Sequence, residues 1–524
     1  MMNEKELMDY LNRKKQIILY GAGMVGGLVK TRLESNNLGE KICCFTKTVV
    51  SGPEKYKGIN VIGLDSIEEA DEDTEILVCA LSETGNSMVH ELEKRNIKNF
   101  TVISGELLTD LEDHYLEEQR LLKREATTKQ YDIIFFSQDN NSTSGAFISM
   151  GGLCDEIQKK SGLRILVVLP RYGDGEELLR EFHLDYTYVK RRTEWIRAKE
   201  IRTGSVERES LYNADEIEEL RALIRNTGAR LVHVSGMFVF AGAIAAREEG
   251  IPVIWHIREN IWTQGNCFIN EKEAYKLMNG SRAVVCVSNH VHQAYPGLNE
   301  DVIRIIYNGA DDERFYERRD ILVSPVCRIL MVGHITRLKG QEILIRALGC
   351  LKDKNMELPQ VTFVGGGEAG YLNYLQGLML RKGLERHVTF AGRTSEPERY
   401  YKQADIAVSA TSGGEGFDRV RIESMLSGCL LITNDLGAAR EIVEDGKTGY
   451  LYESGSADSL SNAIIRALSD VKKSREMAVK GQRLCMEKFT KSHNAGQVLA
   501  LYREVMGTGY GDRIWGQPGI PTGF

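Results

Sequence analysis

Apolar runs of strand length alternate with segments of helical periodicity along most of the chain. The runs are three to six residues long and rich in β-branched side chains, and each is followed by a stretch with apolar residues at helical spacing. This alternation predicts parallel sheets covered by helices, which is the α/β class. The strand-like runs fall into three groups, so we expect three such units in succession.

The first unit, which we call the N-terminal unit, spans residues 1–105. Its strands are expected at 16–20, 42–45, 76–80 and 100–103. Gly21, Gly23 and Gly26 follow the first strand as G-x-G-x-x-G and precede a helical segment. This strand, turn and helix pattern predicts a small Rossmann-like domain and marks the three glycines as candidate nucleotide-binding residues.

The next stretch, residues 106–130, is charged and carries leucines at helical spacing. It contains neither glycine nor proline. We therefore expect a helical connector instead of a flexible linker.

The rest of the chain holds two further units, residues 131–310 and 311–475, which we call the first half and the second half. Residues 476–507 are expected to form helices that cross back to the first half, and residues 508–524 form a flexible tail rich in Gly and Pro. The strands expected in the two halves are 131–136, 164–169, 231–234, 253–256, 283–287, 328–333, 361–364, 388–390, 406–408 and 430–432.

Two glutamates eight residues apart carry the strongest chemical signal. Glu415 lies in a glycine loop with Gly414 and Gly416, and Glu423 lies about two turns into the following helix. Such an arrangement directs two carboxylates and a helix N-terminus at one point, which suits a polyhydroxyl ligand that carries a phosphate. The alternative is two surface carboxylates beside an ordinary helix.

Three segments in order along the chain, 307–311, 332–340 and 412–425, resemble those of retaining GT-B glycosyltransferases of the family-4 type, which carry an E-x7-E motif. The resemblance covers residues 131–507. It implies a GT-B pair of facing Rossmann-like domains, preceded here by a third, smaller Rossmann-like domain.

The resemblance also implies an activity. Enzymes of this type move a sugar from a nucleoside diphosphate sugar to a hydroxyl group of a glycan or lipid-linked acceptor, with retained anomeric configuration and without a metal ion or further cofactor. The role implied is cell-surface polysaccharide synthesis, in the cytoplasm or on the inner face of the cytoplasmic membrane. A non-catalytic nucleotide-sugar scaffold or sensor is the alternative function, and an NAD-dependent oxidoreductase is a second.

By this resemblance the donor lies between the halves. Lys339 and Arg337 are expected at the diphosphate, the amides of Gly416 and Phe417 behind it, and Glu423 at the ribose. Glu415 is expected at the sugar hydroxyls. Arg337 as a solvated loop residue is the alternative for that side chain.

Other positions complete the expected site. Gly333 and His334 belong to the loop after the first strand of the second half, where His334 stands in place of the usual arginine. His256 is expected at a strand end beside the reacting sugar, and Gly145, in the loop 140–146, between acceptor and diphosphate. A packing histidine and a plain helix cap are the respective alternatives, and Arg258 with Glu259 is either a ligand pair or a local ion pair.

In the N-terminal unit, Thr46 and Lys47 stand where a dinucleotide-binding domain places an acidic residue at the end of its second strand. This absence argues against ordinary NAD binding. A structural or assembly module, through which the chain could form oligomers, is favoured there over a nucleotide site.

Charge and composition bear on three further kinds of site: for nucleic acid, for membranes and for metal ions. The net charge of −7 gives no general attraction for nucleic acid, and no apolar run is long enough to span a membrane. The ten cysteines are scattered without C-x2-C spacing, which indicates reduced thiols instead of a metal site, and the acidic turn 71–73 is expected to be solvated surface. The basic segment 190–202, which includes Trp195, suggests contact with an anionic membrane surface, with a solvated face as the alternative.

Overall fold

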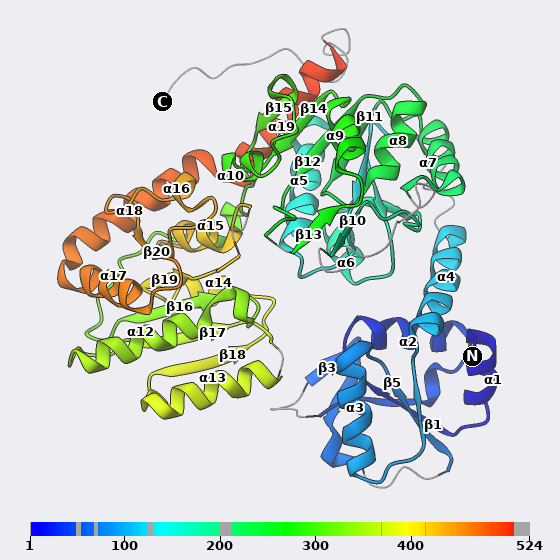
Figure 1. Cartoon of the computed structure of the whole chain (residues 1–524), viewed down its shortest axis with the longest axis horizontal. Helices are drawn as coiled ribbons and strands as arrows, with labels where there is room; N and C mark the ends of the chain where they lie inside the picture. The colour runs from blue at the N-terminus through cyan, green and yellow to red at the C-terminus, as the bar shows by residue number, and fades with distance from the viewer. Residues whose placement is uncertain are drawn as a thin grey trace.

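The computed structural model of the protein describes residues 2–48, 54–67, 72–122, 129–198, 211–263, 265–367, 369–413 and 416–507. Three α/β units follow one another along the chain, as predicted (Figure 1). Each unit has its own sheet, and nearly all neighbouring strands in the three sheets run parallel.

The N-terminal unit holds a six-stranded sheet in the order β3-β4-β2-β1-β5-β6. Only β3 runs antiparallel to its neighbour, and that hairpin was not predicted because its outer strand is the polar sequence Glu-Lys-Tyr. The elements are β1 Gln16–Tyr20, β2 Ile42–Lys47, β3 Glu54–Tyr56, β4 Ile59–Gly63, β5 Thr74–Val78, β6 Phe100–Val102, α1 Glu4–Leu11, α2 Met24–Ser35 and α3 Ser82–Lys94.

The predicted connector is the helix α4, Gly105–Leu122, and it packs on both neighbouring units. It contacts α1 and α2 on one side and a strand of the first half on the other. Tyr115 is buried at this junction, where its ring meets Tyr172 of the first half edge to face at 4.8 Å. The helix is therefore part of the core of both units and not a solvated spacer.

The first half is built on a seven-stranded parallel sheet in the order β15-β14-β12-β11-β7-β8-β9. A small antiparallel ribbon, β10 with β13, stands beside it. The elements are β7 Ile133–Ser137, β8 Ile165–Leu169, β9 Asp185–Tyr188, β10 Ile196–Ala198, β11 Leu231–Ser235, β12 Val253–Ile257, β13 Asn266–Phe268, β14 Ala283–Cys286, β15 Ile303–Ile305, α5 Gly145–Ser161, α6 Gly175–Glu181, α7 Ala214–Thr227, α8 Phe240–Glu248, α9 Glu271–Asn279 and α10 Asn289–Gln293.

The second half has a six-stranded parallel sheet in the order β18-β17-β16-β19-β20-β21. Its helices cover both faces of the sheet (Figure 1). The elements are β16 Arg328–Val332, β17 Gln360–Val364, β18 Val388–Gly392, β19 Ile406–Ser409, β20 Leu430–Asn434, β21 Tyr450–Tyr452, α11 Asp312–Phe315, α12 Gln341–Asp353, α13 Ala369–Lys382, α14 Glu398–Tyr401, α15 Arg419–Leu426, α16 Ala439–Ile442 and α17 Ala457–Ser469.

Two helices close the described chain, α18 Val471–Lys488 and α19 Lys491–Met506. Helix α18 packs on α15 and β20 and so belongs to the second half, whereas α19 returns to the first half and packs on α5. The predicted boundary at residue 475 thus falls inside α18, and only α19 makes the crossing.

The chain passes between the halves twice, and the two passages are bonded together. The amide of Ala310 donates to the carbonyl of Phe489 at 2.9 Å, and the amide of Lys491 donates to the carbonyl of Ala310 at 2.8 Å. At Gly309 a Cβ would lie 2.4 Å from the carbonyl oxygen of Thr490, so only glycine allows this approach.

All ten cysteines are unpaired thiols. Cys43 is exposed, Cys350 is half-buried, and the other eight are buried. No helix in the described ranges is both long enough and apolar enough to cross a bilayer.

The expected membrane-facing segment takes a different position. Trp195 is only 1% exposed and stacks on Phe240 with ring centroids 4.4 Å apart, inside the core of the first half. Lys190 is paired with Asp113, and Arg192 with Glu219 at 3.0 Å. The role of Trp195 as a membrane anchor is therefore wrong, because the indole is interior, and Lys190 and Arg192 are paired with carboxylates. Residues 199–202 lie outside the described ranges, and membrane contact through the rest of the segment stays a prediction.

We expect Trp195→Ala to lower the free energy of unfolding by about 3–5 kcal/mol, the usual range for deleting a buried large aromatic side chain. Denaturant unfolding measures this change. Arg192→Ser, which removes a surface ion pair from the same segment, serves as the control and should change the free energy by less than about 1 kcal/mol. A Trp195→Ala protein as stable as the parent would contradict the interior position of the indole.

Candidate functional site

The order of strands in each half reverses at one point, and the loops at that point define the candidate site. In the second half β16 and β19 are neighbours, and the chain proceeds outward from them in opposite directions. In the first half β7 and β11 have the same relationship. Crevices for ligands form outside the carboxyl ends of the strands at such switch points.

Glycines let the loops at the second-half switch point approach one another closely. Gly333 follows β16 with φ of 144°, and a Cβ on Gly365, with φ of 152°, would lie 2.0 Å from the carbonyl oxygen of Gly333. A Cβ on Gly340 would lie 2.2 Å from the carbonyl oxygen of Ala410, at the end of β19. The loop after β16 is thus fitted against the loops after β17 and β19.

The two cationic residues predicted for the diphosphate, Lys339 and Arg337, point to different places in the structure. The stem of Lys339 lies over Gly333, with Cδ 3.9 Å from the position that a Cβ would take there. Arg337 instead places its guanidinium over the rings of Tyr371 and Tyr374 on α13, at 5.4 and 5.5 Å. His334 is exposed, and its carbonyl accepts a hydrogen bond from Gln341. Lys339 therefore stays at the switch point, while Arg337 packs on α13.

The loop with the E-x7-E motif is one of the places where the second half contacts the first. Gly414 and Glu415 lie outside the described residues. The carbonyl of Gly416 accepts a hydrogen bond from the Ser288 hydroxyl of the first half at 2.6 Å. The Phe417 ring packs against Tyr307 at 5.2 Å and Phe489 at 5.4 Å, both in the segments that join the halves. The position of this loop is thus coupled to that of the other half.

Helix α15 begins directly after this loop, and its end is already capped. Asp418 accepts a hydrogen bond from the amide of Val420 at 3.3 Å. This carboxylate offsets the positive charge at the N-terminus of the helix. We therefore expect a bound anion to be held mainly by cationic side chains and less by the helix dipole. Glu423 is 5% exposed and pairs with Arg419 at 2.7 Å, and burial raises its pKa.

The loop after β7 lies at the switch point of the first half. Gly145 is the first residue of α5, which Ser144 caps by accepting from the amide of Phe147 at 3.3 Å. A Cβ on Gly145 would meet nothing within 4 Å. The cap predicted as the alternative is therefore present, and open space lies beside the glycine.

Two carboxylates follow these strand ends, of which only Glu259 was marked from the sequence. Asp139 follows β7, and burial raises its pKa. Glu259 follows β12 and accepts a hydrogen bond from the amide of Met237 at 2.9 Å, and burial raises its pKa to about 7, with Asp139 adding to the shift. Both lie three residues beyond a predicted strand end, so the rule that sites form at carboxyl ends could have identified Asp139 as well.

His256 lies one residue before the end of β12 and is buried. It has 0% exposure, and its Nδ1 is 3.1 Å from Nε2 of His233 on β11. Nδ1 of His233 is 2.7 Å from the hydroxyl of Tyr502 on α19. Nε2 of His256 is buried and has no partner in the described part of the chain, so contact between this ring and a sugar stays a prediction.

This buried chain of three side chains holds α19 on the first half. In one consistent arrangement the Tyr502 hydroxyl donates to His233, and His233 donates to His256. Burial lowers the pKa of both imidazoles well below the ordinary value, and the positive charge of Arg258 adds to the effect. Both histidines are therefore neutral near pH 7.

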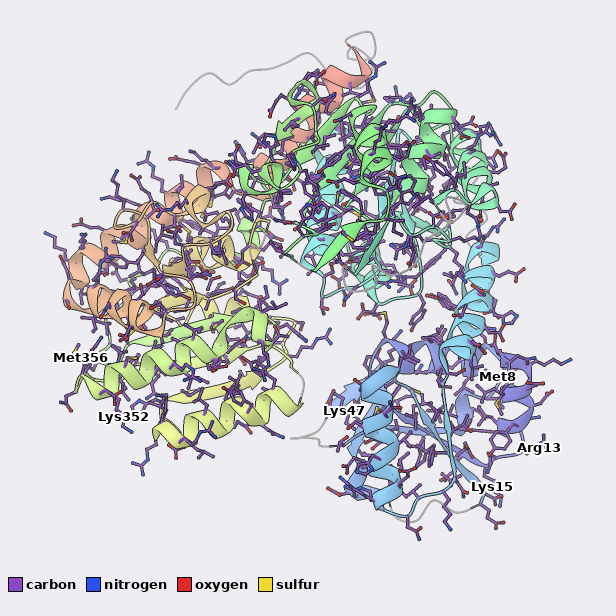
Figure 2. The ribbon with its side chains drawn as sticks, viewed as in Figure 1. Met8, Arg13, Lys15, Lys47, Lys352 and Met356 are labelled. Atoms are coloured by element: carbon purple, nitrogen blue, oxygen red, sulfur yellow. The ribbon has the colours of Figure 1, made fainter. Side chains whose placement is uncertain are left out.

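The three glycines of the N-terminal unit have the geometry of a nucleotide-binding turn. A Cβ on Gly21 would lie 2.8 Å from the carbonyl oxygen of Cys79, and one on Gly26 would lie 2.0 Å from that of Gly21, whereas Gly23 has open space. Lys47 is paired with Glu54 and lies on the edge of the unit away from α1, where Met8 and Arg13 are found (Figure 2). The turn has the required shape, and no acidic residue ends β2.

Among the described residues, no group of three or more His, Cys, Asp or Glu side chains is arranged to hold a metal ion.

Comparisons with known proteins agree with this architecture. Residues 143–314 match the family model "Glycosyltransferase Family 4", and residues 317–484 match "Glycosyl transferases group 1". An uncharacterized glycosyltransferase of Methanocaldococcus jannaschii, MJ1607, is 28% identical over 57% of this chain and 81% of that protein. A D-inositol 3-phosphate glycosyltransferase of Jonesia denitrificans is 29% identical over 44% of this chain and 55% of that protein.

Solved structures share the fold of the two halves. Alr3699/HepE of Anabaena, in complex with UDP, superimposes with a TM-score of 0.60 at 21% identity, over 71% of this chain and all of that one. A glycosyltransferase from Rickettsia africae gives a TM-score of 0.58 at 18% identity, over 72% of this chain and 99% of that one.

The two buried histidines predict a pH dependence of stability. Because their native pKa values lie well below those of the unfolded chain, the unfolded state binds more protons below about pH 6.5. Each histidine should then lower the free energy of unfolding by about 1.4 kcal/mol for every pH unit below that value. We expect stability, measured by denaturant unfolding between pH 7 and 5, to fall with a slope that His233→Asn reduces by about half.

Glu259 contributes in the opposite direction, because a carboxyl with a raised native pKa stabilises the fold as the pH falls. The difference in slope between parent and variant is therefore the quantity to compare. His90→Gln changes an exposed histidine and serves as the control. An unchanged slope in His233→Asn would contradict the neutral buried pair.

Proposed function

Because the chain belongs to the GT-B glycosyltransferases of the family-4 type, we propose that it transfers a sugar from a nucleoside diphosphate donor to a hydroxyl group of a glycan or lipid-linked acceptor. The observation that carries this proposal is the second-half switch point. There Lys339 lies over Gly333, and the loop that bears the E-x7-E motif meets the first half at Gly416.

In the proposed reaction the donor diphosphate lies beside Lys339. Departure of the nucleoside diphosphate builds negative charge on phosphate, and a cation held in place by a packed loop stabilises that charge without reorganisation. Glu415 binds the sugar hydroxyls, and Glu423 the ribose. Alr3699/HepE structures contain UDP and UDP-glucose, which supports a uridine nucleotide as the first donor to test.

The acceptor side belongs to the first half. The loop after β7, with open space at Gly145 and the carboxyl of Asp139, lies at the switch point of that half. Carboxyl groups are suitable hydrogen-bond partners for acceptor hydroxyls. The departing phosphate takes the acceptor proton, so that the anomeric configuration is retained without a covalent enzyme intermediate.

We place this reaction in cell-surface polysaccharide synthesis on the cytoplasmic side of the membrane, where nucleotide sugars are available. The alternative, a nucleotide-sugar-binding scaffold, draws on the glycine turn of the N-terminal unit, whose open space at Gly23 would admit a ligand. Oligomers through that unit belong to the same alternative.

The first test measures release of nucleoside diphosphate from a panel of nucleotide sugars. We expect Lys339→Ala and Glu415→Ala each to lower kcat by about two to three orders of magnitude, the range for loss of one preorganised polar contact. Arg440→Ala, an exposed arginine of the same half that pairs with Asp435, serves as the control. Near-normal turnover in either site variant, or no turnover by the parent with any donor, would refute the assignment.

The second test concerns metal ions. We expect the transferase rate to be unchanged after exhaustive treatment with EDTA, because Lys339 supplies the positive charge at the diphosphate. Loss of activity that added Mn²⁺ or Mg²⁺ restores would overturn the metal-independent mechanism.

A further inference from the structure

Arg258 is a buried cation at the junction of the two halves. It is the first residue after β12, and its carbonyl oxygen lies 2.5 Å from the position that a Cβ on Gly416 would take. Its side chain is held by neutral groups: Nε donates to the Ser235 hydroxyl at 3.1 Å, and Nη1 donates to Oδ1 of Asn308 at 2.6 Å. The residue is 7% exposed, and Nη2 has no partner in the described part of the chain.

No carboxylate of the described residues forms a salt bridge with this guanidinium. The neighbouring Glu259 instead accepts a hydrogen bond from the amide of Met237, so the local ion pair considered from the sequence is not formed. Arg421, 1% exposed, shows the contrast, because its Nε lies 3.5 Å from Asp418. A buried guanidinium is ordinarily paired in this way.

Arg419 brings a second cation to the same place from the other half. It is the first residue of α15, and its Nη2 pairs with Glu423 at 2.7 Å. Its Nε is buried and has no partner among the described residues. Gly416, three residues before Arg419, lies against the carbonyl oxygen of Arg258, so the start of α15 is next to Arg258. Burial is the main cause that lowers the pKa of Arg258 to about 10, and the charge of Arg419 adds to it.

Two guanidinium groups, one from each half, thus bring unused donors to the same junction. Like charges in a shielded site repel each other, and each unused N–H group there is costly. An anion between them would offset both effects, and a phosphate group is the anion that arginine binds best.

We propose that Arg258 and Arg419 together form a phosphate seat that spans the two halves and receives the terminal phosphate of the nucleoside diphosphate. The seat rests on the proposed function for the identity of its ligand. It adds a cation from the first half to the donor site, next to the contact between Ser288 and Gly416, so that a bound diphosphate holds the two halves together. From the sequence, Arg258 was expected either as a ligand residue or as half of an ion pair, and Arg419 was not singled out.

The experiment compares the affinities of UDP, UMP and uridine by isothermal titration calorimetry. The variants are Arg258→Met, and Arg419→Gln, which keeps a donor for Glu423. We expect each variant to weaken the binding of UDP by about 10- to 100-fold, which is the range for loss of a hydrogen bond to a charged group. The affinities for UMP and uridine should be nearly unchanged. Arg247→Met and Arg440→Met remove an exposed arginine from each half and serve as matched controls.

An unchanged affinity for UDP in both folded variants would overturn the seat, and so would an equal loss for UDP, UMP and uridine, which indicates a structural role. If the parent protein binds none of the three, inorganic pyrophosphate is the second probe. If pyrophosphate raises the melting temperature of the parent but not of either variant, the phosphate seat is supported even though the proposed donor nucleotide does not bind. No rise in the parent would overturn the seat.

Discussion

The paired crossing of the chain is the constraint on which the two halves depend. Ala310 and Phe489 are bonded to each other where the chain leaves the first half and where it returns, and Gly309 makes their approach possible. The hydrogen bond between Tyr502 and His233 then fixes the returning helix on the first-half sheet. Because the two segments that connect the halves are hydrogen-bonded to each other, they form one joint, which we call the hinge.

Everything proposed for chemistry lies on the loops that this hinge brings together. The glycine-fitted loop after β16 and the loop that contains Gly416 belong to the second half, and the residues after β7 and β12 belong to the first. Phe417 connects the hinge with the donor loop directly. Its ring packs on the hinge residues Tyr307 and Phe489, and its backbone continues the loop that bears the E-x7-E motif. The loop with the E-x7-E motif is therefore in direct contact with the hinge, without any intervening element.

Periodicity was sufficient for the class of fold and for nearly all of the central strands, because buried parallel strands appear as uninterrupted apolar runs. It failed for β3, an exposed polar edge strand, and it placed the start of the returning helices at residue 476, inside α18, although only α19 returns to the first half. Motif order indicated the loops after β16 and β19 as the donor site, and in the structure Lys339 lies over Gly333 in the first of these loops. It could not place side chains: Trp195 and His256 are interior because of packing partners that are distant in sequence, and Arg337 packs on α13 for the same reason.

The distribution of thiols gives the protein two natural attachment points for spectroscopic labels. Cys43 is exposed on the N-terminal unit and Cys350 is half-buried on the second half, while the other eight cysteines are enclosed. Burial raises the pKa of both thiols, so labelling would require a mildly alkaline buffer. A fluorophore pair at these two positions would report the distance between the N-terminal unit and the second half in solution, without a single engineered cysteine.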